Sequence, residues 1–227
     1  MSQISYSIYA IFYIGFSAYA FWVWRQTKAW SSFFAFLVSA ALIYDNGIIA
    51  LGNTLGEGEL LRVLTVGRFC VHFTVVPLLI WTSLKQAERA GYDWAKKPLV
   101  QWAFRILIGV LILSGFVTEV HGIALELMNV DGVLRYMLTD AIFTAIVPVA
   151  GAVVALVIGI LLWRRSGWLW MFWGTLVIFI AEGALRGTEN VVLLVVQNGA
   201  EILYMLAYLQ TELFLTTEHT ERTEKNL

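Results

Sequence analysis

Long apolar runs separated by short polar connections make up most of the chain. Each run is close to the ~20 apolar residues that a helix needs to cross a bilayer. The runs are continuous rather than alternating, which argues against a transmembrane barrel. They predict an all-α, polytopic integral membrane protein. Its seven transmembrane helices are expected at residues 5–24, 32–52, 61–82, 103–121, 140–163, 168–187 and 191–215.

Two connections are longer than the others, at 83–102 and 122–139. The second contains the stretch GIALELMNVDGVLRYMLTD, which we interpret as a short interfacial helix. Residues 217–227 are polar and predict a solvated or loose cytoplasmic tail. Residues 1–216 then form a single seven-helix domain, because neither a linker nor an internal repeat divides them.

Composition supports the membrane assignment and narrows the partners. The 227 residues are 59% hydrophobic and 14% charged, and the mean hydropathy is +0.75. A soluble domain rarely has that balance, so we expect a multi-pass protein, most simply of the cell membrane. The net charge of −1 gives no reason to expect nucleic acid as a partner. A single cysteine excludes an intramolecular disulfide.

The distribution of basic residues predicts the orientation. The first, third and fifth connections and the tail together hold 11 of the 15 lysines and arginines. Cytoplasmic connections carry such an excess, so the N-terminus should lie outside and the C-terminus in the cytoplasm. All 10 tryptophans fall near the same three connections. Indole prefers the boundary between water and lipid, which supports an aromatic belt on the inner side.

Strongly polar residues within the runs are expected at similar depths, in the outer half of the membrane. At a rise of about 1.5 Å per residue, Asp45 and Arg68 lie about 10 Å below the outer surface and His72 about 16 Å below it. Glu182 and Glu201 fall in the same outer layer. Lipid offers polar groups no partner, so these side chains should point into the bundle. The inner halves are expected to be almost purely apolar.

This convergence predicts an outward-opening polar pocket with two kinds of residue. Carboxylates with a raised pKa and a histidine serve as acids or bases, and arginines and amides bind ligand groups. The expected catalytic residues are Asp45, His72, Glu182 and Glu201. The expected ligand-binding residues are Asn46, Arg68, Arg186, Asn198 and Tyr204. An ion pair between Asp45 and Arg68 could equally be a structural lock between helices.

Among the polar residues expected in the outer half of the membrane, acids outnumber arginines and lysines. This excess of negative charge raises the question of a cationic cofactor. Carboxylates without compensation are costly in a medium of low dielectric constant. Protonation, a cationic ligand or a divalent metal ion would each resolve the imbalance. The candidate metal ligands are His72, Asp45 and Glu201, without a recognised metal motif. A retinal protein is excluded, because no lysine lies within a predicted span.

Three classes of function remain open on the residues alone. An asymmetric pocket with apolar walls suits an enzyme that acts on a membrane lipid or an amphiphilic small molecule by acid–base or metal-assisted chemistry. A proton- or cation-coupled transporter of a small solute would need a polar path through the inner half. A receptor or assembly subunit would bind a ligand or partner without chemistry.

Overall fold

The chain is mostly helical, as its apolar pattern predicts. The computed structural model describes residues 2–117, 125–130, 132–138, 146–184 and 191–224. Nine helices and two strands lie in this part of the chain. In order they are α1 (Ser2–Thr27), α2 (Trp30–Leu55), α3 (Glu59–Val75), α4 (Leu78–Arg89), α5 (Asp93–Lys96), α6 (Pro98–Gly115), β1 (Leu125–Val130), β2 (Val133–Leu138), α7 (Ile146–Ser166), α8 (Trp170–Ala184) and α9 (Val191–Glu224).

Five helical segments among the described residues are long and apolar enough to cross a membrane. They are Gln3–Thr27, Trp30–Leu55, Glu59–Arg89, Pro98–Gly115 and Val147–Ser166. Helix α8 contributes a shorter apolar stretch, Trp170–Ala181. The chain is therefore a helical membrane protein. Helix α9 extends beyond the predicted boundary at residue 215 and continues through polar residues to Glu224.

Pro77 divides one of the long segments into α3 and α4. Helix α3 ends at Val75 and α4 begins at Leu78, so the helix is interrupted at this proline. Proline has no backbone N–H and cannot continue the hydrogen-bond ladder. The chain crosses the break in a tight turn, with Leu79 N donating to Val76 O and Ile80 N to Pro77 O, each at 3.0 Å.

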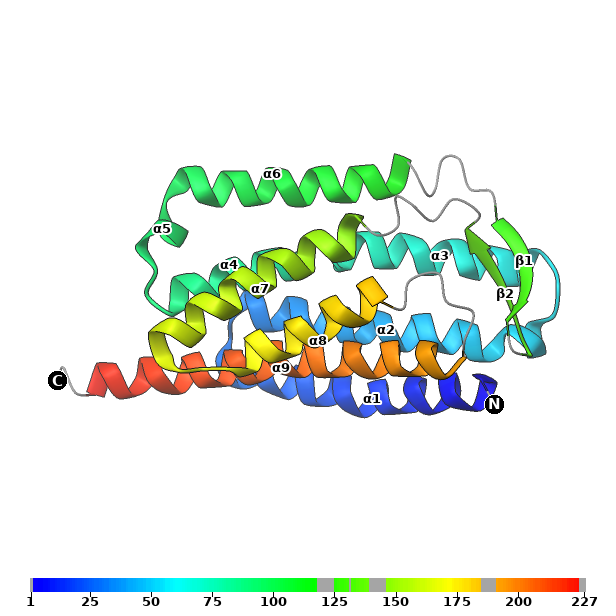
Figure 1. Cartoon of the computed structure of the whole chain (residues 1–227), viewed down its shortest axis with the longest axis horizontal. Coiled ribbons are helices and arrows are strands. Elements are labelled where there is room, and N and C mark those ends of the chain that lie inside the picture. The colour runs from blue at the N-terminus through cyan, green and yellow to red at the C-terminus, as the bar shows by residue number, and fades with distance from the viewer. Residues whose placement is uncertain (1, 118–124, 131, 139–145, 185–190, 225–227) are drawn as a thin grey trace.

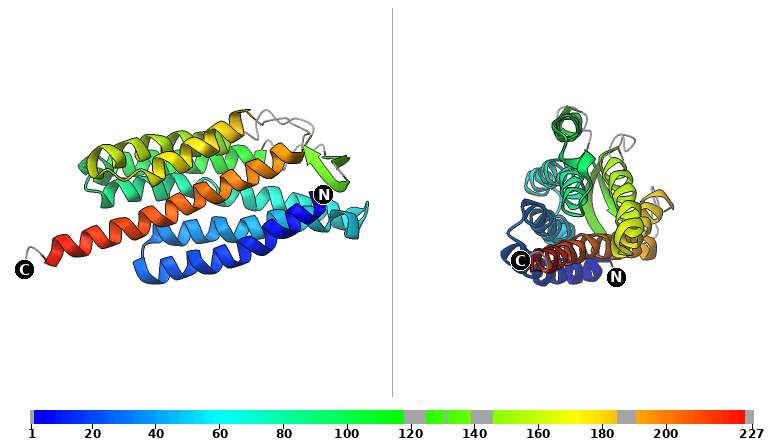
Figure 2. Two further views of the ribbon diagram at one scale, coloured as in Figure 1. Left: turned by 60° about the horizontal axis from the view of Figure 1, so that its bottom comes forward. Right: turned by 90° about the vertical axis from the view of Figure 1, so that its left-hand side faces the viewer.

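The helices run roughly along one direction and form a bundle (Figure 1). The N-terminus lies at the end that carries the two strands, and the C-terminus lies at the opposite end. Helix α9 runs beside α1, and α6 lies at the edge of the bundle (Figure 2). Many side chains of α6 are exposed, including Leu99, Ile106 and Leu113. An exposed apolar face on a membrane helix is a face toward lipid.

The expectation of a helix between residues 122 and 139 is wrong. Strands β1 and β2 pair antiparallel there, from Leu125 opposite Leu138 to Val130 opposite Val133. Gly132 has a φ of 79°, which only glycine adopts without strain, and its N–H donates to Asn129 Oδ1 at 2.9 Å. The Asp-Gly dipeptide is a strong hairpin signal that outweighs the apolar content of the segment.

The hairpin packs on the end of α2 through a close backbone approach. Asn53 Oδ1 accepts a hydrogen bond from Leu134 N at 2.8 Å, and Asn53 Nδ2 donates to Gly132 O at 2.5 Å. A Cβ atom at Gly52 would lie 1.8 Å from Leu134 O, so only glycine allows this approach. Val133 is buried with Tyr6, Ile49 and Ala50. The hairpin therefore covers one end of α1 and α2.

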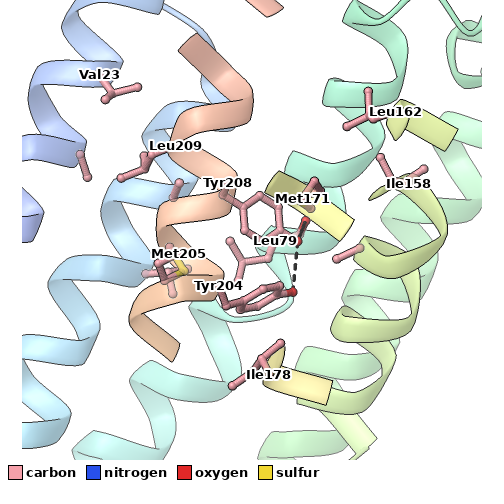
Figure 3. Close-up of a cluster of buried hydrophobic side chains, with 14 of the residues drawn as sticks. Val23, Leu79, Ile158, Leu162, Met171, Ile178, Tyr204, Met205, Tyr208 and Leu209 are labelled. Atoms are coloured by element: carbon pink, nitrogen blue, oxygen red, sulfur yellow. Dashed lines mark hydrogen bonds between the residues drawn. The ribbon is translucent and has the colours of Figure 1, made fainter. Parts of the chain in front are cut away.

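The largest buried cluster among the described residues joins α1, α2, α4, α5, α7, α8 and α9. Figure 3 shows its centre, where Tyr204, Met205, Tyr208 and Leu209 of α9 point among side chains of neighbouring helices. Tyr208 is fully buried. This core lies in the half of the bundle nearer the C-terminal end of α9.

Candidate functional site

A small pocket lies between α2 and α3 and contains a charged pair. Asp45 Oδ1 and Arg68 Nε are 2.8 Å apart, and their side chains are 26% and 15% exposed. The cavity is small, with a volume of about 10 Å³, which is enough for about one water molecule. The lining residues are Val38, Ala41, Leu42, Asp45, Arg68, Val71, His72, Val75 and Val76.

Helical spacing explains why these residues share one pocket. The lining positions of α2 and α3 recur every three or four residues, so each set forms a stripe on one face of its helix. The two helices are held together by Tyr44, whose hydroxyl donates to Leu64 O at 2.9 Å. Gly67 leaves room for that ring, since a Cβ there would lie 2.8 Å from the Tyr44 oxygen. The polar groups are therefore set among aliphatic walls.

His72 lines the same pocket, one helical turn after Arg68. Its carbonyl oxygen accepts a hydrogen bond from Val76 N at 3.0 Å, immediately before the break at Pro77. The guanidinium of Arg68 also lies over the ring of Phe69, 4.9 Å from its centroid. A carboxylate, a guanidinium and an imidazole thus meet in one apolar-walled space. Such a group can bind an oxygen-bearing ligand and exchange protons with it.

Two of the predicted pocket residues, Glu201 and Asn46, lie elsewhere among the described helices. Glu201 belongs to α9. Asn46 is fully buried, and its Nδ2 donates to Leu42 O of its own helix at 2.9 Å. Neither residue lines the pocket between α2 and α3.

Tyr204 lies in a chain of hydroxyl groups deeper in the core. Its hydroxyl is 3.2 Å from that of Tyr208, which in turn is 2.8 Å from Ser83 Oγ (Figure 3 shows the two rings). Asn198 lies in α9, one turn before Glu201, and also has polar contacts. Neither side chain lines the pocket between α2 and α3.

Two predicted residues cannot be placed in the site. Arg186 lies outside the described residues. Glu182 falls in α8, but its side chain also lies outside the described part of the chain. The structure therefore brings together three of the predicted residues, Asp45, Arg68 and His72.

No metal centre forms among the residues that the structure describes. No three His, Cys, Asp or Glu side chains there lie close enough to hold an ion. His72, Asp45 and Glu201, the candidates from the sequence, accordingly do not make such a group. The nearest charged partner of Asp45 is instead a guanidinium, which already compensates its negative charge.

A second charged network lies near the C-terminal end of α4. Glu212 is fully buried in α9 and forms an ion pair with Arg89 of α4, while Ser32 Oγ donates to Glu212 Oε2 at 3.1 Å. Thr27 Oγ1 lies 2.6 Å from Ser32 Oγ, and Arg89 also donates to Thr216 Oγ1. The network joins α2, α4 and α9 close to the α1–α2 connection.

A sequence signal for this network exists. Tyr204, Tyr208, Glu212 and Thr216 recur every four residues, which places them on one face of α9. Comparisons with known proteins found no matching family model, no similar curated protein and no similar solved structure.

Proposed function

We propose that the chain crosses the cell membrane seven times, with its N-terminus outside and its C-terminus in the cytoplasm. Helices α1, α2, the α3–α4 segment, α6, α7, α8 and α9 supply the crossings. The excess of lysine and arginine near the C-terminal end of the bundle supports the orientation. The β1–β2 hairpin then lies on the outer side, and the Arg89–Glu212 pair on the inner side.

In this arrangement the pocket between α2 and α3 binds the polar group of a lipid-like or amphiphilic molecule and catalyses acid–base chemistry on it. The observation that carries this proposal is the pair Asp45–Arg68 with His72 beside it in aliphatic surroundings. The pocket admits only a small oxygen-bearing group, so the apolar remainder of the ligand would lie outside it, along the aliphatic surfaces of α2 and α3.

The chemistry follows from the three side chains. Arg68 binds the ligand oxygen through its guanidinium N–H groups. Engagement of the guanidinium releases the Asp45 carboxylate, which then accepts a proton from the ligand. His72, as the imidazolium, donates a proton to the product and then recovers the proton that Asp45 took from the ligand, so both side chains return to their starting states. Exclusion of water by the aliphatic walls strengthens each of these interactions.

A turnover assay tests this proposal. The purified protein in nanodiscs is incubated with a total membrane lipid extract, and consumed and formed species are quantified by mass spectrometry. Asp45→Asn, Arg68→Gln and His72→Gln should each lower turnover at least tenfold per folded molecule. Glu59→Gln is the matched control, because Glu59 is exposed and only pairs with Arg62 within α3. Equal turnover in all five proteins would refute the proposal.

A proton-coupled carrier is the second candidate, and the buried polar groups of the inner half favour it. Beyond the break at Pro77, Ser83 contacts Tyr208, and Gln86 Nε2 donates to Tyr208 O at 3.2 Å. The Arg89–Glu212 pair follows toward the inner end. Polar groups are thus present on both sides of the break, as a proton path requires.

Proteoliposomes separate the two candidates. An internal pH dye reports proton flux under a potassium diffusion potential, and empty liposomes give the background. A carrier predicts flux that His72→Gln abolishes and Glu59→Gln preserves. Flux no greater than in empty liposomes would reject the carrier, and the turnover assay would then decide the enzyme.

A further inference from the structure

Two cations lie near one indole ring at the inner end of α4 and α6. Lys85 Nζ is 4.9 Å from the centroid of the Trp81 ring, and Arg105 Cζ is 5.1 Å from it. Arg105 also lies 4.9 Å from the ring of Trp102. Cation–π attraction to two indoles holds the Arg105 guanidinium in place, although a second positive charge is nearby.

The cluster retains one positive charge. Glu88 Oε2 lies 2.7 Å from Lys85 Nζ and accepts a hydrogen bond from Gln101 Nε2 at 3.0 Å. Among the described residues, Arg105 forms no ion pair with a carboxylate. The next cation on α4, Arg89, is already paired with Glu212. One monovalent anion would therefore neutralise Lys85, Arg105 and Glu88 together.

The position of the cluster identifies the class of that anion. Arg105 is exposed and lies about 10 Å along α6 from its start at Pro98. The helix beyond it presents Ile106, Val110 and Leu113 at its exposed surface. Helix α6 lies at the edge of the bundle (Figure 2). A phosphate held at Arg105 would thus belong to a molecule whose acyl chains can follow the apolar face of α6.

We propose that Arg105, Lys85 and the rings of Trp81 and Trp102 form a binding site for one anionic phospholipid of the inner leaflet. The guanidinium donates two hydrogen bonds to the phosphate, a geometry for which arginine is suited. The Lys85 ammonium provides the second positive charge. A zwitterionic lipid carries its own cation beside the phosphate and leaves the charge of the cluster uncompensated.

Native mass spectrometry of the whole chain tests this site. Delipidated protein is titrated with phosphatidylglycerol or phosphatidylcholine, and the first bound lipid is quantified. Wild-type protein should bind phosphatidylglycerol at least tenfold more tightly than phosphatidylcholine. Arg105→Gln and Lys85→Gln should each remove most of that preference, because hydrogen bonds between charged partners are the strongest. Lys96→Gln is the control, since Lys96 is an exposed inner-side cation paired with Asp93.

Several outcomes would overturn the proposal. These are equal affinity of the wild type for both lipids, an unchanged preference in both Arg105→Gln and Lys85→Gln, or an equal loss in Lys96→Gln. Displacement of phosphatidylglycerol by an equal concentration of inorganic phosphate would show that the site binds phosphate without the lipid. Circular dichroism confirms that each variant is helical. The result is independent of turnover in the pocket between α2 and α3.

Discussion

Two ion pairs between arginine and an acid lie at different levels of the bundle, in different surroundings. Glu212 pairs with Arg89 and is fully buried, and it also accepts a hydrogen bond from Ser32. Asp45 pairs with Arg68, is 26% exposed and lies in a pocket with aliphatic walls. The same chemical pair is thus enclosed by hydroxyl groups in one place and open to a ligand in the other.

The difference separates a structural role from a functional one. A buried charge is tolerated when its partners are fixed, and Arg89 and Ser32 supply those partners from two other helices. A ligand could reach Glu212 only by breaking this network. Asp45 and Arg68 come from adjacent helices and share a space with His72, so a ligand can replace the carboxylate as the partner of the guanidinium. Stability should therefore depend on the first pair and turnover on the second.

Removal of Glu212 should give the largest loss of stability. Glu212→Ala removes the buried carboxylate that pairs with Arg89, whose side chain is 24% exposed, and should cost about 3 kcal/mol of unfolding free energy. The measurement is reversible unfolding in mixed micelles, followed by circular dichroism. In the double variant with Arg89→Met the loss should shrink, because both charges are then absent. A loss below about 1 kcal/mol would mean that the Arg89–Glu212 pair does not hold these helices together.

Substitution of Gly52 should have the next largest effect. In Gly52→Ala the new methyl group would meet Leu134 O, so the hairpin must move away from α2, at a cost of about 1–3 kcal/mol. Gly47→Ala is the matched control in the same helix, because a Cβ there has no neighbour within 4 Å. Accelerated hydrogen exchange in β1 and β2 should accompany the loss. Equal stability of the two variants would contradict the close approach.

Substitution of Arg68 should affect stability less than function. Arg68→Gln removes a partly exposed ion pair, which should cost about 1 kcal/mol. Turnover or proton flux should nevertheless fall at least tenfold, because the ligand loses its charged partner. The two measurements are made on the same preparation. If Arg68→Gln unfolds as readily as Glu212→Ala and its folded fraction stays active, both ion pairs have a structural role only.

The sequence predicts the helices well because apolar length is a local property. Continuous runs predicted the starts of the spans that contain Asp45 and Arg68 to within two residues, although the second span is interrupted at Pro77. The spacing of four between Arg68 and His72 placed both on one face. The hairpin was missed, because average hydrophobicity was given more weight than the Asp-Gly dipeptide at positions 131 and 132. A turn is specified by a few residues, so it is easily overlooked in an apolar segment.

The depth of a residue was a poorer guide to its partners. Glu201 and Asp45 were expected in one pocket because their helices cross the same layer, yet Glu201 does not line the pocket that contains Asp45. Helix rotation decides which residues meet, and it depends on the packing of all neighbouring helices. Glu212 is a second example, because its burial depends on Arg89 of α4 and Ser32 of α2, and the spacing of residues along α9 does not reveal these partners.

The pair of Asp93 with Lys96 is strongly exposed and should show the smallest effect of the pairs compared here. The hydrogen bond from Lys96 Nζ, and the charge of that ammonium, hold the pKa of the Asp93 carboxyl below its usual value. Because the pKa of Asp93 is lower in the folded than in the unfolded protein, the pair stabilises the fold at pH values above the unfolded-state pKa. This contribution is lost as the pH falls through the folded-state pKa.

Lys96→Gln should therefore raise the pKa of Asp93 toward its usual value while leaving unfolding at neutral pH almost unchanged, since solvent screens exposed pairs. The chain has only four aspartates, so carboxyl-labelled protein can be titrated by NMR, with Asp93→Asn to assign the signal. If Lys96→Gln lowers the free energy of unfolding at neutral pH as much as Glu212→Ala does, burial does not determine how much each pair stabilises the protein. An unchanged Asp93 titration would show that the ammonium exerts no such effect.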